Sequence, residues 1–325
     1  MVHKIWRQFP ETEAKLKKFQ PYLLDAVNLD NSRIHKRILA LLSSGGKMIR
    51  PGIFYLFSEF GQTIDENRLR SGAASLELLH VATLIHDDVV DKSPLRRGVV
   101  TIQTDYGSKN AIYAGDFLFT CYFSEVLKSS DQHEIFVDHM HSMKNILSGE
   151  LKQMDLNFKQ DITVDEYLDE IKGKTAELFK LSFQQAAKLT HCSAPLISLG
   201  EKVGLLIGQA YQILDDILDY DGNSTKTKKP VLEDIQAGVY TLPLILAIKN
   251  NPQAFKKILN KKDKMTAEEA NQVADLVRAN NGPSNALKMA NQMSDQALDL
   301  LAKLPEQRAK DDLIKLVKLM LHRDE

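Results

Sequence analysis

Two apolar stretches, each ending in three aspartates, constrain this chain more than any other feature. Leu76–Asp91 carries the first set and Tyr211–Asp219 the second, and both keep the pattern Asp-Asp-x-x-Asp. On a helix, residues four apart share a face, so the first and last aspartates of each motif would lie together with the middle one beside them. Each cluster would stand at a helix C-terminus, where the helix dipole is already negative. Carboxylates are unfavourable in that position unless a cation binds there.

Mg²⁺ is the cation that fits two such clusters. Hard divalent cations take oxygen ligands and are often shared between a few carboxylates and the phosphates of a substrate. The two motifs are too far apart in the chain to belong to one loop, so we expect them to face each other across a cavity. A single Asp-Asp-x-x-Asp sequence on a helix is common by chance and usually marks a solvated face. Two copies, each ending an apolar stretch, favour the metal–phosphate interpretation.

Composition and charge exclude several classes of protein. The chain has 325 residues, of which 43% are hydrophobic and 26% charged, as in ordinary globular proteins. The net charge of −1 offers no general attraction to nucleic acid or to an anionic membrane. Two cysteines, Cys121 and Cys192, make no disulfide framework, which fits a reducing compartment. Neither a signal-peptide core nor a run of about 18 apolar residues is found. We therefore expect a cytoplasmic protein with no nucleic-acid partner and no stable membrane insertion.

Helical periodicity dominates the chain, and no convincing alternating strand is found. The polar stretch Asp221–Pro230 is the clearest loop. Neither a linker nor a shift in composition indicates a second domain. We expect residues 1–325 to form one all-α domain, a bundle of long helices around a central cavity. The predicted helices are 10–28, 31–43, 51–60, 65–91, 108–128, 132–157, 164–189 and 195–220, with shorter helices in 240–322.

Basic residues gather near the expected helix ends. Gly45–Pro51 is a glycine-rich turn that contains Lys47 and Arg50. Glycines let backbone N–H groups approach an anion, and the two cations add charge. For this stretch alone, a helix cap with incidental basic residues is an equally good alternative. Acids for a metal and bases for phosphates together indicate a diphosphate substrate. Further residues of the basic set are Arg96, Arg97, Lys174 with Thr175, Lys228 and Lys229.

Two polar residues stand inside the apolar stretches. His80 lies two turns before Asp87 on roughly the same helical face. A histidine in such a stretch is often a hydrogen-bonded core residue, and its place beneath the acidic motif makes a ligand role equally good, so both interpretations stay open. Gln212 precedes the second motif by one turn and would face the same site.

Taken in order, these motifs resemble the trans-isoprenyl diphosphate synthase (polyprenyl synthetase) family. Within it, the chain is most similar to long-chain members such as the catalytic subunit of heptaprenyl diphosphate synthase. The resemblance runs from Gly45 to Pro243. The family usually has a basic residue where Met48 stands and often a glycine at Lys228 and Leu232. The matching residues are Gly45-Gly46-Lys47 with Arg50-Pro51, Leu78-Leu79-His80, Asp87–Asp91, Arg96-Arg97-Gly98, Gly115–Leu118, Gly149-Glu150 with Gln153, Lys174-Thr175, Gln212–Asp219, Lys229-Pro230, Asp234 and Thr241-Leu242-Pro243.

The resemblance implies an enzyme that needs Mg²⁺ and condenses an allylic diphosphate with isopentenyl diphosphate, head to tail. It implies that Asp87, Asp91 and Asp215 bind the metal, with Asp88 and Asp219 in support. Isopentenyl diphosphate would be bound by Gly46, Lys47, Arg50, His80 and Arg97. The allylic diphosphate would be bound by Arg96, Lys174, Thr175, Gln212 and Lys229. The residues expected to be catalytic are Asp87, Asp88, Asp91, Lys174, Asp215 and Asp216.

The length of the product depends on the path below Asp87. In the family, a bulky aromatic residue five positions before the first aspartate limits short-chain enzymes, and here that residue is Ala82. The resemblance therefore implies a long-chain all-trans product of about C30–C40 for quinone side chains, made from farnesyl or geranylgeranyl diphosphate. It also implies a homodimer formed through the predicted helices 108–128 and 132–157, or a heteromer with a small non-catalytic subunit.

Three alternatives are weighed against this interpretation, and the motifs argue against the last two. A short-chain farnesyl or geranylgeranyl diphosphate synthase would use the same motifs. A class I terpene cyclase normally replaces the second aspartate motif by an Asn/Ser/Glu motif and would lack Lys47, Arg50 and Arg97. A non-catalytic partner subunit loses the acidic clusters, and this chain keeps both.

Overall fold

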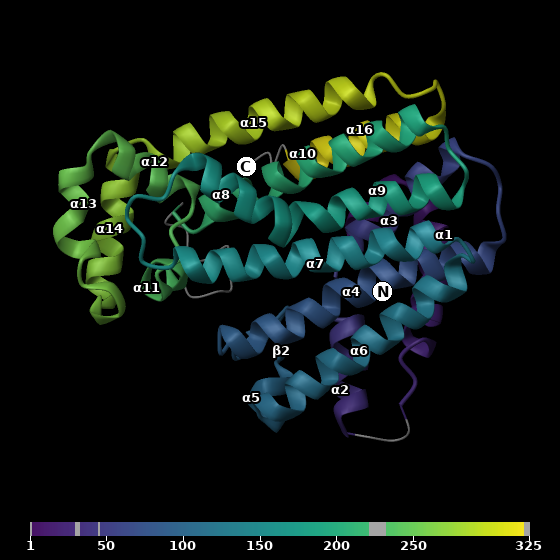
Figure 1. Ribbon diagram of the computed structural model, residues 1–325, viewed down its shortest axis with the longest axis horizontal. Coiled ribbons are helices and arrows are strands. Elements are labelled where there is room, and N and C mark those ends of the chain that lie inside the picture. The colour runs from purple at the N-terminus through teal and green to yellow at the C-terminus, as the bar shows by residue number, and fades with distance from the viewer. Residues whose placement is uncertain (1, 30–32, 45, 221–231, 322–325) are drawn as a thin grey trace. The chain divides into compact units, whose positions relative to one another are not determined.

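The computed structural model describes residues 2–29, 33–44, 46–220 and 232–321 and confirms the predicted all-α fold (Figure 1). The predicted loop Asp221–Pro230, with Lys228 and Lys229, lies outside the described residues. No helix in these ranges is long and apolar enough to cross a bilayer. The helices are α1 (Pro10–Asp25), α2 (Arg33–Ser43), α3 (Ile49–Phe57), α4 (Glu66–Val90), α5 (Ile102–Tyr106), α6 (Ser108–Ser129), α7 (His133–Leu156), α8 (Val164–Ile171), α9 (Glu177–Leu189), α10 (Ala194–Leu218), α11 (Glu233–Ala237), α12 (Leu242–Asn250), α13 (Pro252–Leu259), α14 (Ala267–Ala279), α15 (Gly282–Leu301) and α16 (Arg308–Leu321), with 3₁₀ turns η1 (Lys4–Gln8), η2 (Ser58–Phe60) and η4 (Lys262–Lys264).

The chain divides into two compact units. The first contains Met1–Met140, Leu181–Glu201 and Pro305–Leu313. The second contains His141–Lys180, Lys202–Leu304 and Ile314–Glu325. Helices α7, α9, α10 and α16 have residues in both units. A single domain over the whole chain stays a prediction.

Helix α4 is central to the first unit. Its N-terminus is capped by Asp65, whose side chain accepts hydrogen bonds from the backbone N–H groups of Asn67 and Arg68. Most of its middle is buried, and α6 packs beside it (Figure 1). The approach is close because α6 has a glycine at the contact: a Cβ atom on Gly115 would lie 2.2 Å from Cε1 of His86. This packing places the first acidic motif at the C-terminal end of α4.

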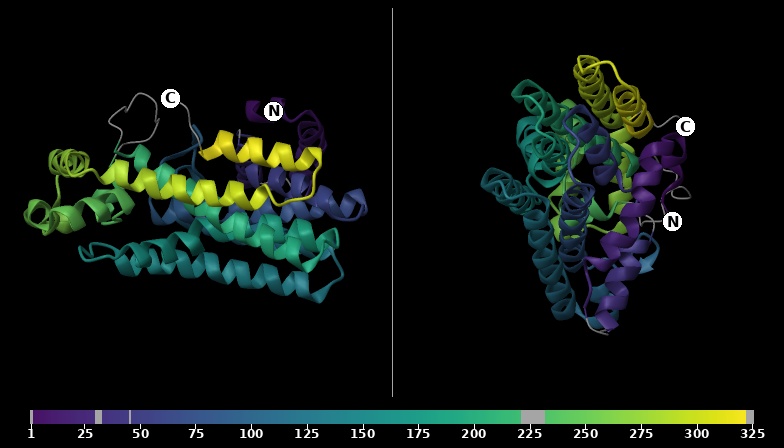
Figure 2. Two further views of the ribbon diagram at one scale, coloured as in Figure 1. Left: turned by 90° about the horizontal axis from the view of Figure 1, so that it is seen from above. Right: turned by 90° about the vertical axis from the view of Figure 1, so that its right-hand side faces the viewer.

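The second unit has an apolar core of its own, built from the short helices near its C-terminal part. Phe255 of α13 and Val273 and Val277 of α14 are fully buried in this core. Helices α12 and α14 both contact α15. Figures 1 and 2 show α12, α13 and α14 gathered near the N-terminal end of α15.

Two local features differ from the predicted helices. A two-stranded antiparallel hairpin, β1 (Leu95–Arg96) and β2 (Val99–Val100), follows α4, where the sequence showed no strand. The predicted helix 164–189 is interrupted by a π-helical turn, η3 (Lys172–Ala176). Backbone from α7 comes very close here, because a Cβ atom on Gly149 would lie 2.3 Å from the backbone N of Lys174. Such π turns are rare and frequently occur at functional sites.

Candidate active site

The first acidic motif forms the last turn of α4. The backbone N–H of Asp91 donates a 2.8 Å hydrogen bond to the carbonyl of Asp87. Lys92 has a left-handed backbone, with φ of 52°, and ends the helix. Asp91 is exposed and Asp87 is partly exposed, whereas the middle residue, Asp88, is only 3% exposed. The outer carboxylates of this motif therefore reach solvent, and the middle one does not.

A short hairpin holds Arg96 against Asp88. The turn residues Arg97 and Gly98 both have positive φ, 53° and 76°, as a two-residue hairpin of type I′ requires. The adjoining Arg96 donates a 2.6 Å hydrogen bond from Nε to Oδ1 of Asp88. The hairpin base is fixed by Thr101, whose hydroxyl donates to the carbonyl of Ser93 at 2.7 Å. Arg96, which was expected to bind the allylic diphosphate, thus forms an ion pair with Asp88 of the first motif.

The structure brings together most of the residues expected at isopentenyl diphosphate. Nη2 of Arg97 lies 3.4 Å from Nε2 of His80. A Cβ atom on Gly46 would lie 2.6 Å from Nη1 of Arg97, so the glycine makes room for the guanidinium. Burial, and then the charges of Arg50, Arg97 and Arg96, hold the pKa of His80 well below its ordinary value. A neutral His80 surrounded by cations forms a site that attracts an anion.

Glu77 belongs to this site, although the sequence argument overlooked it. It lies one turn before His80 on α4 and is buried. Burial raises the pKa of its carboxyl, and the charges of Arg97 and Arg50 act in the opposite direction. The signal in the sequence was an acid inside an apolar helical stretch, three residues from a histidine.

The second acidic motif repeats the arrangement of the first. Asp215 is exposed and Asp219 partly exposed, whereas Asp216 is only 6% exposed. The hydroxyl of Tyr167 donates to Oδ2 of Asp216 at 2.6 Å, and Nε2 of Gln212 donates to Oδ1 at 2.8 Å. Burial is the main cause that raises the pKa of Asp216 well above its ordinary value. Tyr167 is a further residue that the sequence argument missed.

Hydrogen bonds in the second unit also orient the other residues expected at the allylic diphosphate. The hydroxyl of Thr175 donates to Oε1 of Gln212 at 2.7 Å. This bond links the π turn of η3 to helix α10. The side-chain amide of Gln212 donates its N–H to Asp216 and accepts a hydrogen bond from Thr175 at its carbonyl oxygen. These two bonds determine the orientation of the amide.

Lys174 is held by a network of its own. Its Nζ atom donates to Oε1 of Gln153 at 2.8 Å and lies 3.0 Å from Oε2 of Glu150. Nε2 of Gln153 in turn donates to Oε1 of Glu170 at 2.8 Å. Burial raises the pKa of Glu170 to about 7. The ammonium group is thereby positioned by two side chains of α7 and indirectly by a buried acid of α8.

The carboxylates of the two motifs suit a hard divalent cation. In the described ranges, no three carboxylate, imidazole or thiol groups come close enough to hold a metal ion by themselves. Mg²⁺ is usually bound by one or two carboxylates together with substrate phosphates. The outer aspartates of each motif fit that mode. The first motif belongs to the first unit and the second motif to the second, so their approach across a cavity stays a prediction.

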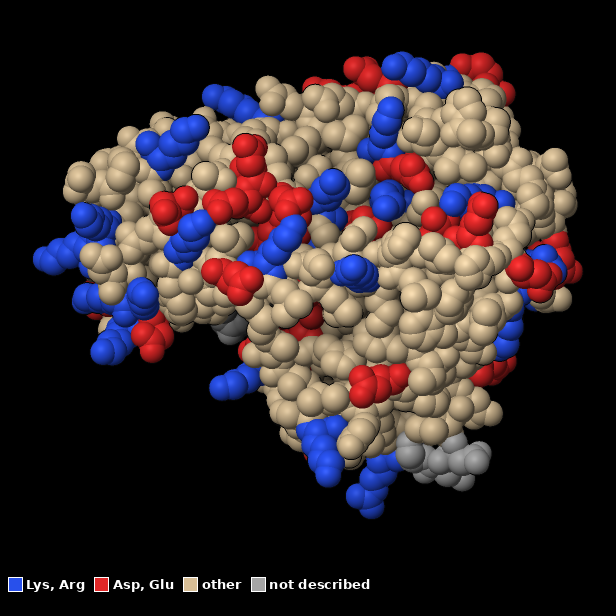
Figure 3. All heavy atoms as spheres, viewed as in Figure 1, with Lys and Arg blue, Asp and Glu red and all other residues tan. Residues whose placement is uncertain are grey.

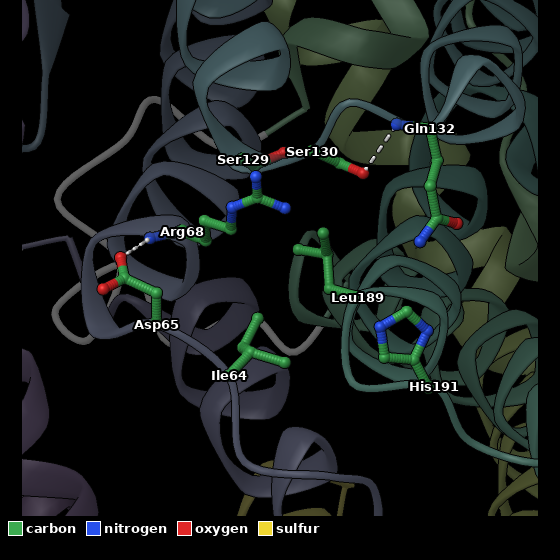
Figure 4. Close-up of a pocket in the computed structure, with 8 residues that line it drawn as sticks. All are labelled: Ile64, Asp65, Arg68, Ser129, Ser130, Gln132, Leu189 and His191. Carbon is green, nitrogen blue, oxygen red and sulfur yellow. Dashed lines mark hydrogen bonds between the residues drawn. The ribbon is translucent and has the colours of Figure 1, made fainter.

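A pocket of about 210 Å³ occurs at the opposite end of α4 from the acidic motif (Figure 4). In the view of Figure 4 the side chain of Leu189 lies between those of Arg68 and Gln132. It contains none of the predicted site residues. It is lined by Ile64, Asp65, Arg68, Ser129, Ser130, Gln132, Leu189 and His191.

Comparison with known proteins shows the family to which the chain belongs. A family model described as Polyprenyl synthetase matches residues 31–280. The crystal structure of geranylgeranyl pyrophosphate synthase from Lactobacillus brevis is 52% identical, covers 98% of this chain and 99% of its own, and has a TM-score of 0.95. Heptaprenyl diphosphate synthase component 2 of Geobacillus stearothermophilus is 30% identical over 88% of each chain. A polyprenyl synthase from Caulobacter crescentus, complexed with calcium and isoprenyl diphosphate, is 26% identical with a TM-score of 0.92 and covers 100% of this chain and 99% of its own. The chain belongs to the polyprenyl synthetase family and is a trans-prenyltransferase.

Proposed function

We propose that this trans-prenyl diphosphate synthase condenses isopentenyl diphosphate with an allylic diphosphate and extends it to a product of about C30–C40 for quinone side chains. The observation that carries the proposal is that one helix, α4, bears residues expected to bind a diphosphate and residues expected to bind the metal. Within the first unit, α4 presents His80 beside Arg97 and, two turns later, the solvent-facing carboxylates of Asp87 and Asp91. The proposed anion site and the proposed metal ligands would thus lie two turns apart on one helix.

Mg²⁺ is the proposed metal, held by Asp87, Asp91, Asp215 and Asp219. When bound, it neutralises the allylic diphosphate and makes it a better leaving group. Asp88 and Asp216 would act from inside the protein, because each is buried and hydrogen-bonded. The calcium and isoprenyl diphosphate in the Caulobacter crescentus relative support a divalent cation at a diphosphate.

The chain's own side chains would hold the two substrates and the leaving group. Lys47, Arg50 and Arg97 would bind the diphosphate of isopentenyl diphosphate, with neutral His80 as a hydrogen-bond partner. Lys174, fixed by Gln153 and Glu150, would bind the allylic diphosphate. Cleavage of the C–O bond between the allylic carbon and the diphosphate group releases pyrophosphate and leaves an allylic carbocation, which the double bond of isopentenyl diphosphate attacks in a site that would exclude water. The proton that is then lost passes to the departing pyrophosphate, since no described side chain is an obvious base.

Product length is proposed from the small residue five positions before the first aspartate. Ala82 is fully buried in α4, and it presents a single methyl group where a bulky aromatic residue would limit the product. A geranylgeranyl product is the second candidate, because the 52% identical Lactobacillus brevis protein bears that name. Products made from farnesyl diphosphate and isopentenyl diphosphate, separated by chromatography, distinguish the two. A product that stops at about C20 favours the second candidate.

We further propose a cytoplasmic homodimer formed through α6 and α7. Tyr113 and Leu127 of α6 are both 62% exposed, and so is Leu151 of α7. Met140, Leu147, Leu151 and Met154 recur on α7 at the spacing of one helical face. Figure 3 shows mostly uncharged surface over each of these helices. The alternative is a small partner subunit, which the name "component 2" of the Geobacillus stearothermophilus relative suggests.

The decisive assay uses the purified chain with Mg²⁺, isopentenyl diphosphate and farnesyl diphosphate. The wild type should release pyrophosphate, and Asp87→Ala should lower turnover by at least about a hundredfold with an unchanged circular-dichroism spectrum. Asp131→Ala is the control, because its carboxylate is 84% exposed and pairs with Arg68. Full activity of Asp87→Ala would contradict the proposal. A silent wild type that binds isopentenyl diphosphate in calorimetry would indicate the two-component alternative.

A further inference from the structure

Trp6, the chain's single tryptophan, lies against the glycine-rich basic turn. It belongs to η1 and is fully buried. Its indole Nε1–H donates a 2.6 Å hydrogen bond to the carbonyl oxygen of Lys47. The ring also fills the space beside the first turn of α3, because a Cβ atom on Gly52 would lie 1.9 Å from Cη2 of Trp6. The N-terminal segment is therefore fitted to this turn both by shape and by a directed hydrogen bond.

The backbone that Trp6 holds is in an uncommon conformation. The Lys47 carbonyl belongs to the peptide unit that joins Lys47 to Met48. Met48 caps α3 with φ of 49° and ψ of 38°, a left-handed conformation that is costly for a residue with a side chain. Such a conformation persists only where the surroundings determine it. The indole hydrogen bond on one side and the bond from Gly52 N–H to the Met48 carbonyl, 3.0 Å, on the other supply that constraint.

This turn carries the cations of the anion site. Lys47 and Arg50 lie on either side of the left-handed residue, and the charge of Arg50 acts on partly buried His80. A peptide unit free to rotate could turn its carbonyl, the negative end of its dipole, toward a bound diphosphate. Holding the carbonyl on the indole prevents that rotation and keeps the loop ready for an anion before it arrives.

We propose that Trp6 is a positioning residue for the isopentenyl diphosphate site, acting through the Lys47 carbonyl. The inference rests on the function proposed above for Lys47, Arg50 and Arg97. It goes beyond the family assignment, because the family model matches residues 31–280 and Trp6 lies before that range. The segment is close to the loop at a second point, since the Lys47 charge is among the causes that lower the pKa of His3.

The single tryptophan makes a direct binding test possible. Isopentenyl diphosphate, and inorganic pyrophosphate in a parallel titration, are added to the full chain without an allylic substrate. A diphosphate bound beside Lys47 brings negative charge close to the hydrogen-bonded indole, so we expect the emission of Trp6 to shift and to saturate with the same dissociation constant that calorimetry gives for isopentenyl diphosphate. Emission that stays constant while calorimetry shows binding would overturn the proposal and leave the proposed function intact. A wild type that neither binds nor consumes isopentenyl diphosphate would overturn both.

A second test removes only the donor. Because the chain has one tryptophan, growth of a tryptophan-auxotrophic host on 3-benzothienylalanine replaces the indole N–H with sulfur at this position alone. Loss of one hydrogen bond should raise KM for isopentenyl diphosphate about three- to tenfold. KM for the allylic substrate should change by less than about twofold in the same protein.

The control for a purely structural role is Phe9→Leu. Phe9 packs edge-on against Trp6 with ring centroids 5.6 Å apart, so this variant disturbs packing and leaves the indole N–H in place. We expect it to lower Tm without a selective effect on KM for isopentenyl diphosphate. If the benzothienyl protein keeps the wild-type KM, or if both KM values rise equally, the positioning role is wrong.

Discussion

Nε of Arg96 lies 2.6 Å from Oδ1 of Asp88, and the two side chains are 20% and 4% exposed. The middle aspartate of the first motif is therefore paired inside the protein by the hairpin that follows it. In the second motif the buried middle aspartate, Asp216, accepts hydrogen bonds from two neutral side chains, Tyr167 and Gln212. In each motif the outer aspartates are partly or fully exposed, whereas the middle one is buried.

The Arg96–Asp88 pair should contribute to folding stability. Arg96→Ala would remove this ion pair from a buried carboxylate, which costs roughly 3 kcal/mol. We expect urea denaturation to show a loss of that size for Arg96→Ala. The double variant Asp88→Asn with Arg96→Ala should lose less than the sum of the two single variants. Arg97→Ala is the control, since the Arg97 side chain is exposed, and its loss should be below about 1 kcal/mol. Equal losses for both arginines would show that the pair has no special role.

Glu170 should make stability depend on pH. Its pKa is raised from 4.5 to about 7 by burial. Between these values the folded state keeps a proton that the unfolded state has lost, so the free energy of unfolding falls as pH rises, by at most about 3 kcal/mol. Glu170→Gln removes the titration and should gain stability relative to the wild type from pH 4.5 to pH 8.

Denaturation curves at several pH values measure this difference. Asp169→Asn is the matched control, because Asp169 is the adjacent acid and its side chain is 57% exposed. Its difference from the wild type should stay nearly constant with pH. A constant difference for Glu170→Gln as well would mean that the Glu170 pKa is not raised.

Ala82→Phe should shorten the product. Ala82 is fully buried one turn before His86, and under the proposed function a phenyl ring there would occupy the path of the growing chain. We expect products to shift toward about C15–C20, with turnover retained, because the change leaves the aspartates in place. Chromatography of the dephosphorylated products measures the shift, and Ala82→Gly is the control that should not shorten them. An unchanged length in a folded Ala82→Phe variant would place the chain-length limit elsewhere.

Leu151→Glu and Leu127→Glu should each weaken self-association. Both leucines are 62% exposed on helices α7 and α6, and a buried charge at a dimer interface is costly. Sedimentation equilibrium should show a shift from dimer to monomer. Leu287→Glu is the control, because this leucine is 41% exposed on α15. A wild type that is monomeric at all concentrations would refute the proposed dimer.

Much of the fold followed from local patterns in the sequence. Periodic apolar residues predicted the long helices, because burial of one helical face depends on spacing along the chain. The hairpin at Leu95–Val100 and the π turn at Lys172–Ala176 were not predicted. Two-residue strands are too short to show alternation, and the π turn arises where backbone of α7 approaches at Gly149.

The sequence by itself determined the chemistry of this protein: which carboxylates and cations it carries, and at what spacing on helices. Only the tertiary structure decided which of them are buried and which meet. In the folded chain Arg96 pairs with Asp88, Tyr167 donates a hydrogen bond to buried Asp216, and Trp6 donates one to the Lys47 carbonyl. The reason is physical: spacing along a helix is a local property, whereas burial and hydrogen-bond partners depend on segments that are distant in the chain.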